Sequence, residues 1–157
     1  MSLDSPSIEG ISGHGVRVGI IAARFNQTLV DSLLDHAIET LINAGAETPS
    51  VERVPGSAEL PYAAATLAES KQFDVIIAIG VVIAGDTNHH NLIGDSTAIA
   101  LQDISIQNKV PIINGILIVN NIEQAQARAG TEINRGREFA AAALEMAQFQ
   151  LKWTKTK

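Results

Sequence analysis

The 157-residue sequence contains no cysteine. This absence excludes a disulfide framework, thiolate zinc sites and a cysteine nucleophile. Aromatic residues make up only 4% of the chain, and 11 Lys and Arg stand against 17 Asp and Glu, giving a formal net charge of −6. Such an acidic balance argues against a surface that binds nucleic acid or an anionic membrane. An anionic small molecule therefore requires a local concentration of positive charge.

Long apolar runs are absent as well. No segment approaches the roughly 20 apolar residues that span a bilayer. The N-terminal sequence MSLDSPSIEG also lacks the basic-then-apolar pattern of a secretory signal, so we expect a cytoplasmic protein. The 46% hydrophobic and 18% charged residues are ordinary for a globular chain. We expect a single domain over residues 1–157, with 1–14 as an extended N-terminal arm.

The chain alternates β-branched apolar runs with segments of helical period. Three runs predict parallel strands buried on both faces, and a weaker run predicts a fourth strand. These strands are Val16–Ala23, Val75–Ile83 and Pro111–Val119, and the weaker one is Ser50–Val54.

Helices are predicted between and after these strands. An apolar stripe from Leu29 to Ile42, with acidic residues on the opposite face, predicts an amphipathic helix that ends at Gly45. Further helices are predicted after Pro61, from about 89 to 108, and over 122–128 and 136–153. Strands that alternate with helices predict right-handed crossovers. The fold class is therefore α/β, a three-layer sandwich with a four-stranded parallel sheet and helices on both faces.

Ligands of such folds bind beyond the carboxyl ends of the strands, in the loops that follow them. Those loops read ARFN at 23–26, VPGSAELP at 54–61, IAGDTNHH at 83–90 and VNNIEQAQARAG at 119–130. We therefore expect the chemistry of this chain in these four loops.

The loop IAGDTNHH combines a glycine turn with two adjacent histidines. On a helix, His89 and His90 diverge by roughly 100 degrees and cannot share a metal as residues four apart can. We therefore expect no metal site. The amides of Gly85, Asp86 and Thr87 could hold a phosphate at the start of a helix, or Asp86 or Thr87 could simply cap that helix. A histidine beside a bound phosphate ester could transfer protons near neutral pH.

Taken together, the loops resemble the lumazine synthase family (6,7-dimethyl-8-ribityllumazine synthase). The matching motifs are RFN, VPG-x-x-E-x-P, G-x-V-I-x-G-x-T-x-H, P-I-x-x-G-I-L and NIEQA-x-x-RAGT followed by N-R-G, in order over nearly the whole chain. The resemblance implies a flavodoxin-like sandwich. It also implies condensation of 5-amino-6-(D-ribitylamino)uracil with 3,4-dihydroxy-2-butanone 4-phosphate in riboflavin biosynthesis. The reaction yields 6,7-dimethyl-8-ribityllumazine, phosphate and water, without a cofactor.

The resemblance also implies roles for individual residues on the pyrimidine side. Phe25 stacks on the pyrimidine, against the alternative of a buried core aromatic, and Glu59 holds ribityl hydroxyls. His89 is the acid/base residue, while His90 packs or faces solvent. The further substrate contacts that the resemblance implies are Ser57, Ala58, Val82, Ile83 and Asn114.

On the phosphate side, the resemblance implies that Arg128 binds the phosphate together with the amides of Gly85, Asp86 and Thr87. Arg135 matches a further family position, which is usually a lysine. The Asp86 carboxylate is compatible with a bound phosphate only if its side chain turns to cap the helix while its amide faces the ligand.

Several positions depart from the family pattern. Ala58 replaces a larger apolar residue, Ala84 an arginine, His90 an aromatic and Asn114 a phenylalanine. Each of these changes opens or polarises the pocket. The segment RAGTEINRG is also one residue shorter than the RAGTKAGNKG form of shell-forming members, which weakens the expectation of a larger shell.

The resemblance implies an active site between neighbouring subunits of a ring of five. Phe25, Glu59 and His89 come from one chain, and Asn114, Arg128 and Arg135 come from the next. The expected partners are the two substrates, further copies of the chain in a pentamer or a multiple of it, and riboflavin synthase. Two alternatives stay open: a non-catalytic relative that binds flavin or lumazine as a carrier or scaffold, and a receiver-like regulatory domain. ARFN lacks the acidic cluster that a receiver needs.

Overall fold

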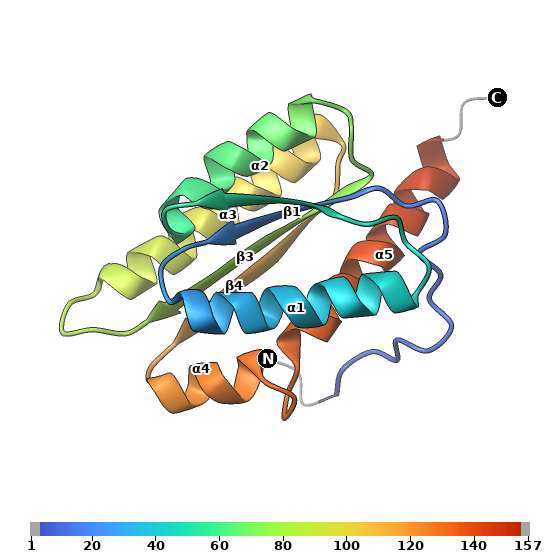
Figure 1. The fold of residues 1–157 in the computed structure, drawn as a ribbon. Helices are drawn as coiled ribbons and strands as arrows, with labels where there is room; N and C mark the ends of the chain where they lie inside the picture. The colour runs from blue at the N-terminus through green and yellow to red at the C-terminus, as the bar shows by residue number, and fades with distance from the viewer. Residues whose placement is uncertain (1–3, 155–157) are drawn as a thin grey trace.

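The computed structural model describes residues 4–154 and shows an α/β sandwich built on a four-stranded parallel sheet of order β2-β1-β3-β4. Helices α1, α4 and α5 cover one face of the sheet, and α2 and α3 cover the other (Figure 1). The predicted fold class is therefore confirmed. In chain order the elements are β1 (Val18–Ala23), α1 (Gln27–Asn43), β2 (Ser50–Val54), the 3₁₀ turn η1 (Ser57–Glu59), α2 (Leu60–Glu69), β3 (Val75–Ile83), α3 (His89–Asn108), β4 (Ile112–Val119), α4 (Ile122–Ala129) and α5 (Arg135–Thr154).

The predicted elements are confirmed with small shifts at their ends. Strand β1 begins at Val18 rather than Val16. Helix α2 begins before Pro61, which occupies the first turn, where its missing N–H costs no helical hydrogen bond. Gly45 follows α1 with a φ of 87°, a left-handed conformation that glycine adopts without strain and that ends the helix.

Two apolar cores lie on the two faces of the sheet because successive residues of a strand point to opposite sides. Ile20 and Ile77 pack with Leu33 of α1 in one core. Ile21 and Ile76 pack with Leu60 and Leu101 in the other.

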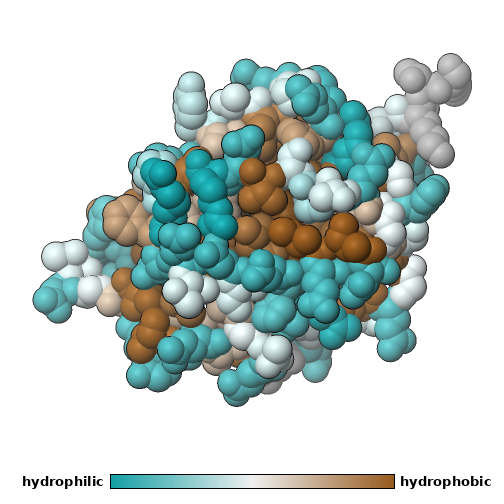
Figure 2. Space-filling view, viewed as in Figure 1, coloured by the Kyte–Doolittle hydropathy of each residue, from teal (hydrophilic) through white to brown (hydrophobic). Residues whose placement is uncertain are grey.

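The prediction that strand β4 is buried on both faces is wrong. Strands β1 and β3 are buried over nearly their whole length, but β4 alternates, and Asn114 and Ile118 are exposed. β4 lies at the edge of the sheet, and α3 covers only part of that side. The other edge strand, β2, is exposed at Ser50, Val51, Glu52 and Arg53. Figure 2 shows a strip of apolar surface between β2 and α1 on this face of the molecule.

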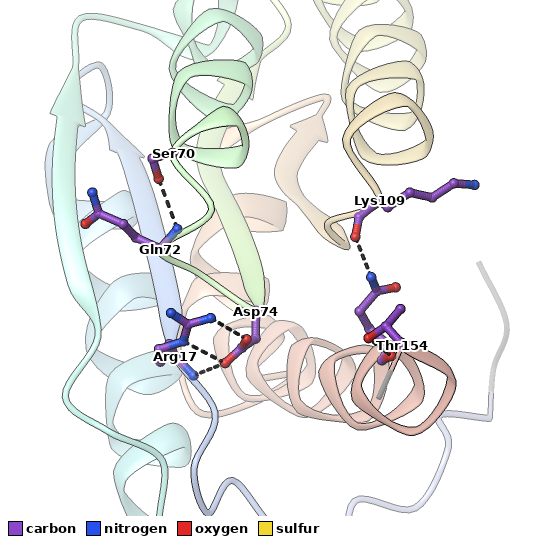
Figure 3. A network of polar contacts seen from close by, with 7 residues as sticks. Arg17, Ser70, Gln72, Asp74, Lys109 and Thr154 are labelled. Atoms are coloured by element: carbon purple, nitrogen blue, oxygen red, sulfur yellow. Dashed lines mark hydrogen bonds and ion pairs between the residues drawn. The ribbon is translucent and has the colours of Figure 1, made fainter. Parts of the chain in front are cut away.

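An ion pair ties the amino ends of β1 and β3 (Figure 3). Arg17 donates from its backbone N–H to Asp74 Oδ2 at 2.8 Å and from its guanidinium to Oδ1 at 2.9 Å. Burial by itself raises the pKa of the Asp74 carboxyl. The hydrogen bonds and the positive charge of Arg17 outweigh that effect, so the pKa lies below the usual range of an aspartate.

The predicted N-terminal arm contains no helix or strand between residues 4 and 14, and residues 1–3 lie outside the described part of the chain. The arm runs along α5. Ser5 Oγ donates to Glu138 Oε1 at 3.0 Å, and the Gln148 side-chain amide donates to the carbonyl of Ser12 at 2.9 Å.

Candidate active site

A cleft of about 390 Å³ lies at the carboxyl ends of β1 and β3. It brings together residues from the first three of the expected loops. The predicted site residues that line it are Phe25, Ser57, Ala58, Glu59, Val82, Ile83 and His89, and the sequence prediction missed Asn26, Gly56, Val81 and Ile93. Asn26 and Gly56 belong to the RFN and VPG motifs, so the motifs already contained a signal for them.

Phe25 projects from the end of β1 into this cleft and is 71% exposed, so the alternative of a buried core aromatic is wrong. The next residue, Asn26, turns the chain into α1 through a left-handed conformation with a φ of 55°. Its side-chain amide donates to the carbonyl of Val81 at 2.8 Å, which ties the turn to β3. An exposed, backbone-anchored phenyl ring is suited to stack on a planar ligand.

Glu59 and Ser57 are fixed by the turn η1. The Glu59 Oε2 atom accepts a hydrogen bond from the Gly56 N–H at 2.8 Å, so one carboxylate oxygen holds the loop and the exposed side chain can offer the other to a ligand. Ser57 is buried against β3. A Cβ atom on Gly80 would lie 2.3 Å from Ser57 Oγ, so Ser57 packs directly against the backbone of β3 at this glycine.

The two histidines have different surroundings. His89 is exposed, begins α3 and lines the cleft. His90 is partly buried, and its Nδ1 lies 3.2 Å from the carbonyl oxygen of Thr87, so it ties the turn to the helix. Only His89 is therefore placed for chemistry in the cleft.

Neither Asp86 nor Thr87 caps helix α3. The N-cap residue is Asn88, and its side chain makes no capping hydrogen bond. The alternative that Asp86 or Thr87 simply caps the helix is therefore wrong, and the cap that would turn the Asp86 carboxylate away from a bound phosphate is not formed. Gly85, Asp86 and Thr87 are all exposed in the loop between β3 and α3 and do not line the cleft.

A second hollow of about 280 Å³ lies between β4, α4 and α5 and collects the other predicted residues: Asn114, Arg128 and Arg135. The Arg128 guanidinium donates to the Gln124 carbonyl at 3.1 Å, and Arg135 pairs with Glu138. Phe139 also lines this hollow and was not predicted. Phe25 and the two arginines thus line two separate cavities of one chain.

Within residues 4–154, no group of three or more His, Asp or Glu side chains is placed to hold a metal ion. None of the helices in that range is both long and apolar enough to cross a membrane.

The parallel sandwich and its carboxyl-edge cleft define the chain as an α/β protein whose candidate site lies at the ends of its strands. The family model of 6,7-dimethyl-8-ribityllumazine synthase matches residues 15–150. The chain belongs to this family, and the resemblance drawn from its motifs is confirmed.

Individual relatives match over nearly their whole length. The 6,7-dimethyl-8-ribityllumazine synthase of Thermococcus gammatolerans is 39% identical over 143 residues, which cover 91% of this chain and 93% of the relative. The Aquifex aeolicus protein of the same name is 41% identical over 140 residues, 87% of this chain and 91% of the relative. Family membership removes the receiver-like alternative.

Proposed function

We propose that this chain carries out the lumazine synthase reaction in a site shared by two neighbouring subunits of a homo-oligomeric ring. The chain condenses 5-amino-6-(D-ribitylamino)uracil with 3,4-dihydroxy-2-butanone 4-phosphate to 6,7-dimethyl-8-ribityllumazine and releases phosphate and water. The observation that carries the shared site is that the residues for the two substrates line two separate cavities of a single chain.

The first cleft supplies the pyrimidine side. Phe25 is the stacking platform, and Glu59 accepts hydrogen bonds from ribityl hydroxyls, with Ser57 and Ala58 along the same loop. Val82 and Ile83 form the wall beside the ring. His89 transfers protons during the condensation, a contribution of about 100- to 10,000-fold for a positioned group.

The second hollow supplies the phosphate side. Arg128 gives the acidic chain the local positive charge that a phosphate ester requires, because an arginine presents several N–H donors to an oxyanion. Arg135 lines the same hollow, where it is paired with Glu138. Asn114 lies at its β4 wall. Gly85, Asp86 and Thr87 lie in the exposed loop before α3, and their amides add donors from the neighbouring subunit when the uncapped Asp86 side chain faces away from the phosphate.

Exposed apolar residues on α3 support the ring. Leu92, Ile99 and Ile106 are 63%, 64% and 65% exposed. They are spaced seven residues apart and so form one stripe along the helix. A stripe of this length is more apolar surface than a solvated helix needs, and covering it with neighbouring chains removes it from water. We propose a ring of five or a multiple of it, in the cytoplasm, with riboflavin synthase as a further partner.

Complementation between two defective chains tests the shared site. Phe25→Ala and Arg128→Ala chains are co-expressed, and lumazine formation is measured. If the chains mix at random in equal amounts, about a quarter of the subunit contacts join an intact Phe25 to an intact Arg128. Mixed rings should therefore recover about a quarter of the wild-type activity.

Arg137→Ala is the matched control, because this exposed arginine lies two residues beyond Arg135 and lines neither cavity. Co-expressed with Phe25→Ala, it should also restore activity, since its own chains are fully active. If mass measurement shows that Phe25→Ala and Arg128→Ala chains mix and no activity returns, the site is contained in one chain and the proposal is wrong.

A further inference from the structure

Two side chains of α1 hold the last carbonyl of α4. Ser32 Oγ donates to the carbonyl oxygen of Ala129 at 2.7 Å, and His36 Nδ1 lies 3.1 Å from the same oxygen. A carbonyl oxygen has two lone pairs and only accepts, so both side chains donate and the His36 Nδ1 carries a hydrogen. Ser32 and His36 are one helical turn apart and therefore approach from the same face of α1.

The same turn of α1 also supports the start of α5. A Cβ atom on Gly136 would lie 2.3 Å from the carbonyl oxygen of Leu33 and 2.9 Å from the Cβ of His36, so the two backbones are in direct contact. Ala129 directly follows Arg128, and Gly136 directly follows Arg135. One turn of α1 thus fixes the residue next to each cation of the second hollow.

Helix α4 is short and buries little side-chain surface of its own. It has only eight residues, and its buried side chains are two alanines, Ala125 and Ala129. Short helices are marginal on their own, and alanines bury little apolar area. The hydrogen bonds at the end of α4 therefore contribute much to fixing the position of this helix.

We propose that Ser32 and His36 are positioning residues for the phosphate substrate. They fix the end of α4 so that Arg128 meets the phosphate of the butanone substrate in the second hollow. This inference rests on the proposed role of Arg128. It differs from a general structural role because it predicts an effect on one substrate and not on the other.

The test compares the KM values of the two substrates. Ser32→Ala and His36→Leu should each raise the KM for the butanone phosphate about three- to tenfold, the loss typical of one hydrogen bond. The KM for the ribitylamino-uracil and kcat should change less than twofold. His36→Asn should restore most of the loss, since its amide can donate from a position close to that of the imidazole Nδ1.

Ser105→Ala is the matched control. Ser105 Oγ donates to the carbonyl oxygen of Val110 at 3.0 Å, an equivalent contact from α3 at the other end of the sheet. This variant should leave both KM values unchanged. Thermal unfolding of every variant shows whether a change in KM accompanies a general loss of structure.

Arg128→Ala separates failure of the inference from failure of the proposed function. If Arg128→Ala raises the butanone phosphate KM and the Ser32 and His36 variants do not, the positioning role is wrong. If these variants raise both KM values equally, they act on the whole fold and the inference is again wrong. If Arg128→Ala itself leaves that KM unchanged, the proposed phosphate role of Arg128 fails, and the inference fails with it.

Discussion

Replacement of Gly80 with alanine should distort the floor of the first cleft. The new Cβ would lie 2.3 Å from Ser57 Oγ, 3.3 Å from Ser57 Cβ and 3.2 Å from Leu60 Cδ1. Rotation of the Ser57 hydroxyl relieves the first contact, but the other two remain tight, so Ser57 and Leu60 must shift by a few tenths of an ångström away from β3. Overpacking of this kind costs about 1–2 kcal/mol at the mild end of the range for buried sites. For a chain of this length that is a fall of roughly 2–8 °C in Tm.

The same displacement moves Glu59, which is fixed to the backbone of this turn. Gly80→Ala should therefore also raise the KM for the ribitylamino-uracil more than the KM for the butanone phosphate. The double variant Gly80→Ala with Ser57→Gly removes the clashing Ser57 atoms and should recover part of the lost Tm. A double-mutant cycle measures this coupling at fixed protein concentration. If the two substitutions are additive in the cycle, the clash with Ser57 is not the cause of the lower Tm.

Three further predictions concern other parts of the molecule. Because the pKa of Asp74 is depressed in the folded state, its contribution is present above about pH 4, the ordinary carboxyl range, and is lost as the pH falls through the folded value. Asp74→Asn should therefore lower the free energy of unfolding by about 1 kcal/mol at pH 7 and by less near pH 3 in urea titrations; an equal loss at both pH values would contradict this. His89→Ala should lower kcat about 100-fold or more while leaving affinity for a ribityl-pyrimidine inhibitor nearly intact, and unchanged turnover would move the proton transfer to another group. Ile99→Glu should place charges on the exposed stripe of α3 and reduce the mass in solution to that of smaller, inactive species, whereas an unchanged mass would show that α3 is not the ring contact.

Much of the fold could be predicted because strands and helices leave local patterns in this sequence. The runs that became β1 and β3 are apolar on both faces, and the stripe of α1 has a clear helical period. The exposure of β4 could not be predicted, since an edge strand differs from a central one only in what lies beside it. Asn114 and Ile118 belong to an apolar run that resembles the runs of β1 and β3.

The candidate site could also be predicted only in part. The motifs predicted that Phe25, Glu59 and His89 share one cleft, because their loops all follow strands at the same edge of the sheet. The pattern around Asp86 and Thr87 wrongly favoured a helix cap, because cap identity depends on the residue at which the helix starts. The contact of His36 with Ala129 joins residues 93 positions apart. On the sequence, His36 is only a polar residue on the flank of a helix, so tertiary packing alone reveals its partner.

Product formation by the purified chain is the decisive test of catalysis. The protein is mixed with 5-amino-6-(D-ribitylamino)uracil and 3,4-dihydroxy-2-butanone 4-phosphate, and lumazine absorbance and released phosphate are followed together. Both products should appear in equal amounts and faster than in the uncatalysed mixture, and Arg128→Ala should slow both. If the chain binds lumazine or flavin but forms no more lumazine than the uncatalysed mixture, it is a carrier or scaffold and not a lumazine synthase.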